Sequence, residues 1–352
     1  GKYVPQNILL TGGAGFIGSC VAETLATKYP HYLIVVLDKL DYCSSQDNLS
    51  NVQTLKNFKF VRGDIRSKFL VDYLLRSENI DTILHFAAST HVDNSFQASV
   101  SFTTNNVVGT HVLLESAREY GKIKRFIHVS TDEVYGGDKD MMSSEESMLA
   151  PTNPYACTKA AAEFICRAYS ISYGLPIIMT RGNNVYGPRQ FPDKLIAKSA
   201  ALLAAGQNAF VHGDGSHRRN YIYVTDCANA FDFILHKAEI GGVYNLGSPI
   251  EISNVNVVRQ LVRLIRLDEN ATDEECDKHI EFVADRAFND RRYRIDMSKL
   301  QQLGWQHQIS WDEGLRKTAA WYSQLSNLER WPNYRDGLVA HPVLDPTSES
   351  HF

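Results

Sequence analysis

The stretch Asn7-Ile8-Leu9-Leu10-Thr11-Gly12-Gly13-Ala14-Gly15-Phe16-Ile17-Gly18 decides the fold of this 352-residue chain. Its apolar start predicts a buried strand, and the apolar spacing from Phe16 to Thr27 predicts a helix. Between them, Gly12 permits a tight turn, Gly15 lets the backbone approach a pyrophosphate, and Gly18 allows the helix to pack closely on the strand. The N–H groups at the start of the helix attract an anion. The pattern is typical of a dinucleotide-binding turn, although a glycine-rich stretch by itself can be a plain turn.

An acidic residue at the end of the next apolar run supports the dinucleotide interpretation. The run from Tyr32 to Leu37 is continuous, as in a strand buried on both faces, and Asp38 ends it 20 residues after Gly18. A carboxylate at this distance can hold the hydroxyls of an adenosine ribose. It would also repel a 2′-phosphate, so the sequence favours NAD over NADP as the cofactor. A solvated strand end is the alternative interpretation of Asp38.

Strands and helices alternate through the first half of the chain. Further runs predict strands at Phe58–Val61, Thr82–Phe86, Phe126–Val129 and Ile177–Thr180, and helices at Phe69–Ser77, Val107–Tyr120 and Tyr155–Tyr173. This alternation predicts an α/β fold with a Rossmann-type, doubly wound parallel sheet. After about Gly182, Gly and Pro become frequent and the alternation loosens. We therefore expect an NAD-binding domain at 1–182, a smaller, irregular substrate lobe at 183–331 whose chain can cross between the two, and a tail at 332–352.

Composition and charge exclude several classes of partner. Hydrophobic residues make up 44% of the chain, and the net charge of −4 predicts no broad attraction to nucleic acid or to an anionic membrane. No apolar run reaches the roughly 20 residues that span a bilayer, and because the first residues lead straight into a predicted strand, we expect no signal peptide. The six cysteines are scattered singly, which favours a reducing compartment and a cytoplasmic protein. No His or Cys cluster has metal-ligand spacing, so we expect no metal.

A tyrosine and a lysine four residues apart are the first candidates for catalysis. Tyr155 and Lys159 share one face of a predicted helix that Pro154 opens. The ammonium group, together with an oxidised nicotinamide, would lower the pKa of the phenol so that it acts as a base. Lys159 can also bond the nicotinamide ribose. The spacing occurs often by chance, but here it follows a strand that ends in polar residues.

Those polar residues are Ser130-Thr131-Asp132-Glu133. Thr131 can hydrogen-bond a hydroxyl that is being oxidised. Adjacent carboxyls in a partly dry pocket raise each other's pKa, so Asp132 and Glu133 can divide into one acid and one base. An oxidation alone does not require this pair, so we expect a further step. The alternative is a solvated acidic loop.

Three other stretches are weaker candidates. Gly63-Asp64-Ile65 follows a predicted strand, from which a side chain could reach an adenine, and the small residues of His85-Phe86-Ala87-Ala88 would let a cofactor lie against the backbone. Arg218-Arg219 could bind a diphosphate through bidentate hydrogen bonds. The alternatives are a simple turn, tight packing and an exposed basic turn. His91 is expected to be a structural rather than a catalytic histidine.

From Asn7 to Trp331 the chain resembles the extended short-chain dehydrogenases/reductases that act on nucleotide sugars, most closely the dTDP-glucose 4,6-dehydratases. The matching segments are T-G-G-A-G-F-I-G from Thr11, H-F-A-A-S-T-H-V-D from His85, N-V-V-G-T from Asn106, S-T-D-E-V-Y-G from Ser130, P-Y-A-C-T-K-A from Pro154, Y-G-P-R-Q-F-P-D-K-L-I from Tyr186, R-N-Y-I-Y-V-T-D from Arg219, V-Y-N-L-G from Val243, D-R-R-Y-R-I-D from Asp290 and L-G-W from Leu303. The resemblance favours the animal member of this family and implies a homodimer, with an interface of four helices supplied by Val107–Tyr120 and Tyr155–Tyr173.

The resemblance also implies a mechanism. Tyr155 would remove the proton of the glucose C4 hydroxyl while the C4 hydride passes to NAD. Glu133 would then take the C5 proton, Asp132 would protonate the leaving C6 hydroxyl, and the hydride would return to C6, giving a 4-keto-6-deoxy sugar. Related epimerases and decarboxylases usually carry Ser where Asp132 stands, which disfavours a 4-epimerase or a decarboxylase. A cofactor-binding protein without activity is a further alternative, but it need not retain all of these groups.

The family's binding residues carry over to matching positions of this chain. For the cofactor, the resemblance implies Gly12, Gly15, Phe16, Ile17, Gly18, Asp38, Lys39, Leu40, Asp64, Ile65, Ala87, Ala88, Thr90, Asn105, Tyr155, Lys159 and Asn184. For the substrate, it implies Thr90, Thr131, Asn184, Lys194, Leu195, Val211, Arg219, Asn245, Asp285, Arg286 and Asn289. The chain departs from the family's usual residues at Ser89-Thr90, at Asn220-Tyr221 and at Ala287-Phe288-Asn289. These departures leave the choice between UDP-glucose and dTDP-glucose open.

Overall fold

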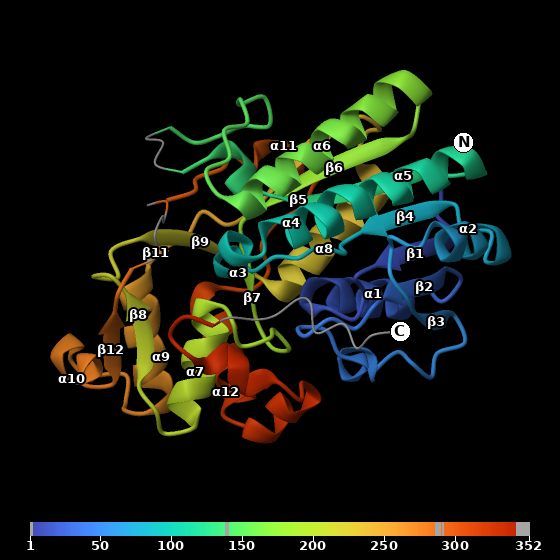
Figure 1. Ribbon diagram of the computed structural model, residues 1–352. Coiled ribbons are helices and arrows are strands. Elements are labelled where there is room, and N and C mark those ends of the chain that lie inside the picture. The colour runs from blue at the N-terminus through green and yellow to red at the C-terminus, as the bar shows by residue number, and fades with distance from the viewer. Residues whose placement is uncertain (1–2, 138–140, 286–289, 291, 343–352) are drawn as a thin grey trace.

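The main element of the structure, a computed structural model, is a seven-stranded parallel sheet (Figure 1). The model describes residues 3–137, 141–285, 290 and 292–342. In spatial order the strands are β10 (Val243–Leu246), β6 (Ile177–Gly182), β5 (Arg125–Thr131), β4 (Thr82–His85), β1 (Asn7–Thr11), β2 (Leu33–Asp38) and β3 (Phe58–Arg62). Each pairing is parallel. The α/β, doubly wound fold expected from the sequence is confirmed.

Helices cover both faces of this sheet. On one face lie α1 (Phe16–Lys28) and α8 (Val224–Lys237), and on the other α2 (Lys68–Ser77), α5 (Gly109–Tyr120) and α6 (Pro154–Tyr173). Alternate residues of one strand enter different cores: Ile8 and Leu10 pack toward α1, and Leu9 packs toward α5. Because both faces are buried, the strands read as continuous apolar runs.

Every strand and helix expected before residue 182 is present, with ends shifted by one or two residues. Before α5, the sequence reasoning missed the short helices α3 (Val92–Gln97) and α4 (Ser99–Phe102) and the π-helical turn Thr103–Val108. It also missed that α8 and β10, both from the second half of the chain, complete the first layer. The domain boundary expected at residue 182 stays a prediction.

Most of the remaining elements form a smaller lobe beside the carboxyl ends of the main strands, at the lower left of Figure 1. Of the remaining helices, α11 (Ser298–Gln302) packs on β10 of the main sheet and lies near the top of Figure 1. The helices of the lobe are α7 (Leu195–Ala204), α9 (Asn254–Ile265), α10 (Asp273–Asp277) and α12 (Trp311–Tyr322). Its strands are β7 (Asn184–Tyr186), β8 (Ala209–His212), β9 (Arg218–Tyr223), β11 (Glu251–Ser253) and β12 (Ile280–Val283). They form two small sheets, in the orders β11-β9-β7 and β12-β8.

Beyond α12, the chain forms the 3₁₀ turns Leu325–Arg330 and Tyr334–Leu338, and the second of these packs against α7. The end of the expected tail, residues 343–352, lies outside the described residues. In the part of the chain that the structure describes, no helix combines the length and the apolar character needed to cross a bilayer.

Candidate active site

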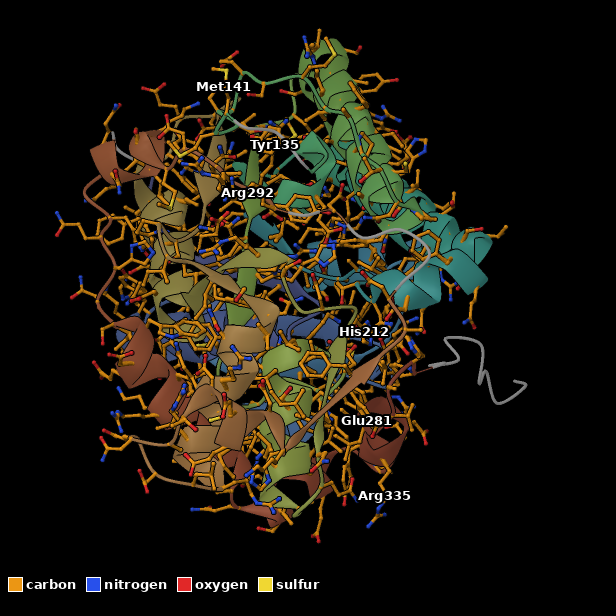
Figure 2. All side chains as sticks on the ribbon, turned by 90° about the vertical axis from the view of Figure 1, so that its left-hand side faces the viewer. Tyr135, Met141, His212, Glu281, Arg292 and Arg335 are labelled. Atoms are coloured by element: carbon orange, nitrogen blue, oxygen red, sulfur yellow. The ribbon has the colours of Figure 1, made fainter. Side chains whose placement is uncertain are left out.

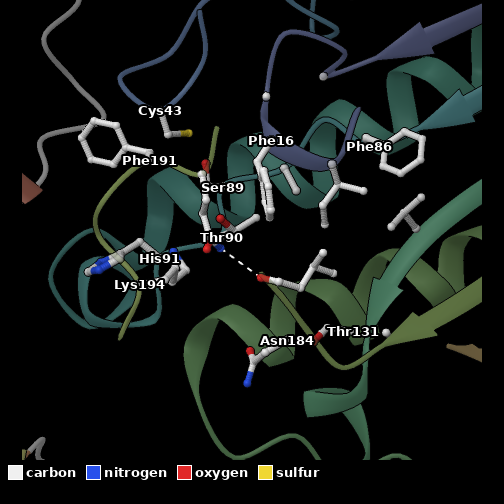
Figure 3. A pocket seen from close by; sticks show the side chains of 18 of the residues that line it. Phe16, Cys43, Phe86, Ser89, Thr90, His91, Thr131, Asn184, Phe191 and Lys194 are labelled. Atoms are coloured by element: carbon white, nitrogen blue, oxygen red, sulfur yellow. Dashed lines mark hydrogen bonds between the residues drawn. The ribbon is translucent and has the colours of Figure 1, made fainter. Parts of the chain in front are cut away.

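A cavity of about 430 Å³ lies where the carboxyl ends of the main strands meet the lobe. Gly12 and Asp38 line it from the sheet, and Lys194 and Arg219 line it from the lobe. Figure 3 shows the side chains of Phe16, Thr131 and Lys194 around this space. The volume is that of a site for a small molecule or a cofactor.

The glycine-rich turn fits a pyrophosphate closely. Gly12 has a φ of +70°, and a Cβ there would lie 2.6 Å from the backbone nitrogen of Ala87, so the turn requires glycine. A Cβ at Gly18 would collide with the carbonyl oxygen of Gly12. A Cβ at Gly15 would have no neighbour closer than that same oxygen, at 3.3 Å, which leaves room beside the turn. No side chain caps the N-terminus of α1, so its first N–H groups point to an anion site.

Asp38 is held rigidly beside this turn. Its carboxylate accepts hydrogen bonds from the N–H groups of Ala14, at 3.0 Å, and Leu40, at 2.8 Å. Burial raises the pKa of this carboxyl, and the two backbone bonds act against that rise. Lys39 and Asp64 also line the cavity here. These residues therefore fit the adenosine end of a dinucleotide.

Tyr155 and Lys159 reach the cavity from the first turns of α6, which begins at Pro154. Burial raises the pKa of the Tyr155 phenol, the Glu133 carboxylate raises it further, and a hydrogen bond with Thr131 acts in the opposite direction. Burial lowers the pKa of Lys159 to about 8. The Lys159 ammonium donates to the carbonyl oxygen of Val129, at 2.7 Å. Burial and Glu133 thus favour the protonated phenol in this structure, and the lowering expected from Lys159 together with an oxidised nicotinamide stays a prediction.

The adjacent carboxyls lie in different surroundings, as the acid and base roles require. Glu133 lines the main cavity and accepts a hydrogen bond from the Asn153 amide, at 2.8 Å. Asp132 is 5% exposed and lies just behind this wall, where it lines a second, smaller cavity with Tyr293. Burial, followed by the charge of Glu133, raises the pKa of Asp132 to about 7. Near neutral pH, Asp132 therefore keeps a proton that an ordinary carboxyl would have lost.

Two hydrogen bonds orient the Asp132 carboxyl. The Asn183 amide donates to Oδ2 at 2.5 Å, and the Thr131 hydroxyl donates to Oδ1 at 3.2 Å. Both donors also line the main cavity. Asp132 is therefore linked to that cavity through two polar side chains. Thr131 is the last residue of β5, and Asn183 directly follows the end of β6.

The structure brings most of the predicted residues together around one cavity. Those that line it are Gly12, Gly15, Phe16, Ile17, Gly18, Asp38, Lys39, Asp64, Ile65, Ala87, Ala88, Thr90, Asn105, Thr131, Glu133, Tyr155, Lys159, Asn184, Lys194, Leu195 and Arg219. Those that do not line it are Leu40, Asp132, Val211, Asn245 and Asp285. Arg286 and Asn289 lie outside the described residues.

Asn245 is the clearest departure from the predicted substrate set. It is fully buried, and its amide accepts from the Tyr135 hydroxyl, at 2.7 Å, and donates to the carbonyl oxygens of Ser143 and Asp296. These bonds tie β10 of the main sheet to the loop after β5 and to Asp296, so the structure gives Asn245 a structural role. Val211 is likewise buried in the core.

Only one member of the Arg218-Arg219 pair faces the cavity. Both lie on β9, where successive side chains point to opposite faces. Arg218 is exposed and forms an ion pair with Glu251, whereas Arg219 lines the cavity and lies over the ring of Tyr293. The alternation along a strand could have separated them, but no strand was assigned to this stretch.

Several site residues had no clear sequence signal. Asn183, Lys198, His212 and Tyr293 also line the cavity. Asn153, which caps α6 and holds Glu133, could have been found, because Asn before Pro marks a helix start. His91 lines the cavity and caps α3, which is in keeping with the structural role expected of it. Among the described residues, no three His, Cys, Asp or Glu side chains are grouped as metal ligands.

Residues 9–318 match the family model for GDP-mannose 4,6 dehydratase. A trifunctional UDP-glucose 4,6-dehydratase/UDP-4-keto-6-deoxy-D-glucose 3,5-epimerase/UDP-4-keto-L-rhamnose-reductase of Arabidopsis thaliana is 54% identical over 97% of this chain. This chain spans about half (50%) of the length of that relative. The dTDP-D-glucose 4,6-dehydratase of Mus musculus is 45% identical over 97% of this chain and 95% of its own length.

Among solved structures, DesIV, a dTDP-glucose 4,6-dehydratase from Streptomyces venezuelae with NAD and TYD bound, superposes with a TM-score of 0.87. It is 36% identical, and the match covers 94% of this chain and all (100%) of that one. The family model covers most of the chain, and the mouse relative matches over nearly its whole length. The chain therefore belongs to the dTDP-glucose 4,6-dehydratase family, as the motifs around Asp132 and Tyr155 predicted.

Proposed function

We propose that this protein is an NAD-dependent nucleotide-glucose 4,6-dehydratase, which converts UDP-glucose or dTDP-glucose to the 4-keto-6-deoxy sugar. One observation carries the proposal: a buried carboxyl with a pKa of about 7 lies beside a carboxylate and a buried Tyr/Lys pair at a single site. A simple oxidation or an epimerisation has no use for the Asp132 proton. An elimination of water requires both an acid and a base.

The chain's own residues carry the proton transfers. NAD, when bound by the glycine turn and Asp38, supplies the hydride acceptor for C4 and the hydride donor for C6. Tyr155 takes the proton of the C4 hydroxyl, and Thr131 hydrogen-bonds that oxygen. Glu133, oriented by the Asn153 amide, takes the C5 proton, which the new 4-ketone has made acidic. Asp132 donates its proton to the C6 hydroxyl, which leaves as water. Glu133 then returns its proton to C5 when the hydride returns to C6, and the proton released from the C4 hydroxyl makes up for the one that Asp132 lost.

The lobe offers the charges that a nucleoside diphosphate needs. Lys194 and Lys198 come from the start of α7, whose N-terminus attracts anions, and Arg219 comes from β9. All three line the cavity opposite the glycine turn. This arrangement supports a sugar linked through a diphosphate, with the glucose between the lobe and Tyr155.

UDP-glucose is the first substrate to test. The plant enzyme named for UDP-glucose is 54% identical to this chain, and the mouse enzyme named for dTDP-glucose is 45% identical. The test is incubation with each sugar nucleotide and detection of the 4-keto product by its absorbance in alkali. Product from neither substrate, in a protein shown to bind NAD, would refute the proposal. Conversion of UDP-glucose to UDP-galactose would establish the epimerase alternative instead.

The homodimer is also proposed. On α6, Phe164 and Ile171 are seven residues apart and exposed, and Val100 and Val108 are exposed on the helices beside it. A second copy packed on this apolar face would bury these side chains in a four-helix interface. Sedimentation of the wild type and of Phe164→Glu tests this: we expect a dimer that the substitution dissociates, and a monomeric wild type would refute it.

A cytoplasmic location is proposed from the thiols. None of the six cysteines is paired, and four of them are buried. Unpaired cysteines persist in a reducing compartment. Imaging of the tagged full-length protein is the test, and residence in the secretory pathway would refute the proposal.

A further inference from the structure

The end of the described chain lies against the wall of the cavity, far in sequence from the residues that it touches. We define residues 334–341 as the C-terminal strap. It begins with the turn Tyr334–Leu338, which packs on α7, and continues past the end of β8. Figure 2 shows His212, at the end of β8, and Arg335, on the strap, on the face of the lobe turned to the viewer.

The strap supplies the hydrogen-bond acceptor for a buried lysine. Lys198 on α7 lines the cavity and is only 8% exposed, and its ammonium donates to the carbonyl oxygen of Val339 at 2.8 Å. A buried ammonium group requires such an acceptor. The strap therefore provides one of the contacts that position a positive charge in the cavity wall.

The strap also orients a histidine of the same wall. His212 Nε2 lies 2.9 Å from the carbonyl oxygen of Ala340. Because a carbonyl oxygen only accepts, this contact places the ring proton on Nε2. The ring of His341 stacks on the His212 ring, with 4.7 Å between centroids. Two contacts from consecutive strap residues thus contribute to the orientation and the tautomer of His212, which lines the cavity.

A third contact positions the strap against the cavity wall. Gly337 is buried, and a Cβ there would lie 2.9 Å from the ring of Phe191 and 3.0 Å from the carbonyl oxygen of Pro192. Phe191 also lines the cavity. Three wall residues from different elements, Phe191, Lys198 and His212, are therefore positioned by one eight-residue segment.

We propose that the C-terminal strap is part of the substrate site, and that it positions Lys198 and His212 to bind the nucleoside diphosphate. The inference rests on the proposed function for the identity of the ligand. The strap residues that act here are positioning residues, because they contact the wall and not the reacting atoms. Loss of the strap should weaken nucleotide binding and leave the NAD end of the cavity unchanged.

The experiment is calorimetric titration of UDP and, separately, of NAD into three forms of the chain: wild type, a deletion of residues 339–352, and a matched deletion of residues 343–352. The longer deletion removes both carbonyl acceptors and His341, whereas the shorter one removes none of these contacts. We expect the Kd for UDP to rise at least about 10-fold in the longer deletion only, with the Kd for NAD within about two-fold of wild type in all forms.

The full-length His341→Ala variant keeps the test decisive if the longer deletion disturbs folding and loses NAD binding. It removes only the ring stacked on His212, and we expect about a three-fold rise in the Kd for UDP with unchanged NAD binding. The inference would be overturned if the longer deletion bound UDP with the wild-type Kd. If that form does not fold, the same result in His341→Ala would overturn it. A wild type that binds no UDP would also overturn it. A wild type that binds UDP but yields no keto sugar would refute the dehydratase function and leave this test intact.

Discussion

Replacement of Asp132 by Asn should slow dehydration strongly and yet stabilise the protein above about pH 4. The two side chains have nearly the same shape. The Asn183 amide can still donate to an amide oxygen at position 132, and the Thr131 hydroxyl can rotate to accept from the new NH₂ group. The substitution therefore removes a titrating carboxyl without removing a hydrogen bond. Loss of the acid should lower turnover by roughly 10²- to 10⁴-fold.

The stability effect follows from the sign of the pKa shift. Burial and Glu133 raise the pKa of Asp132 from 3.8 to about 7. The folded protein therefore binds more protons than the unfolded chain between these values, and its stability falls as pH rises through this range. At about 1.4 kcal/mol per pKa unit, the raised pKa of Asp132 costs the folded protein roughly 2 kcal/mol of stability at pH 5 and roughly 4 kcal/mol at pH 8. Asn at position 132 does not ionise, so these figures are the upper limits of the stability that the substitution can add.

The assay is denaturant unfolding of wild type and Asp132→Asn at several pH values from 4 to 8, with keto-sugar formation measured on the same samples. We expect the two proteins to be equally stable near pH 4 and the variant to become progressively more stable above it. A stability difference that does not change with pH, or an Asn variant that is less stable at pH 8, would refute the raised pKa.

Asp232→Asn on α8 is a control of opposite sign. Burial raises the Asp232 pKa, but hydrogen bonds from His236, Lys28 and Tyr29 outweigh burial and hold the pKa below its usual value. Such a carboxylate contributes stability above the unfolded pKa, and that stability is lost as pH falls through the folded pKa. Asp232→Asn should therefore destabilise the protein by a nearly constant amount from pH 8 to pH 5, and the loss should shrink only below about pH 4, as pH falls toward the folded pKa.

Three further predictions concern the cavity. Glu133→Gln should let NADH accumulate, which its absorbance would show. Product formation should fall roughly 10²- to 10⁴-fold, because no base remains to take the C5 proton. Normal turnover of this variant would exclude Glu133 as that base. Arg219→Ala should raise KM for the sugar nucleotide about 10- to 100-fold, which is the effect of losing a charged hydrogen bond. Arg218 faces away from the cavity, so Arg218→Ala should change KM less than about two-fold. Equal effects of the two substitutions would contradict the assignment of the two faces of β9. Gly12→Ala should lose more than about 1–2 kcal/mol of unfolding free energy and weaken NAD binding, because φ is +70° and a Cβ would press on Ala87; unchanged NAD affinity would argue against this turn as the cofactor site.

Local patterns in the sequence were sufficient for the strands and helices before residue 182 and for the residues that line the sheet side of the cavity. The glycine turn comes directly after β1, Asp38 is the last residue of β2, and Glu133 lies two residues after β5. In a parallel sheet the carboxyl ends of the strands meet at one edge, so motifs that are far apart in sequence converge without further information. The lobe side was harder, because its strands are short and pair with partners that periodicity does not identify.

What the sequence determined by itself is the chemistry available at the sheet edge: a dinucleotide turn, a Tyr/Lys pair and two adjacent carboxyls. What only the tertiary structure decided is how these groups behave and which distant residues support them. The Asp132 pKa depends on burial and on Asn183, which is 51 residues away, and the cavity wall depends on strap contacts such as Ala340 with His212, which span 128 residues. Desolvation and long-range contacts exist only once the chain has folded, and no local pattern of residues encodes them.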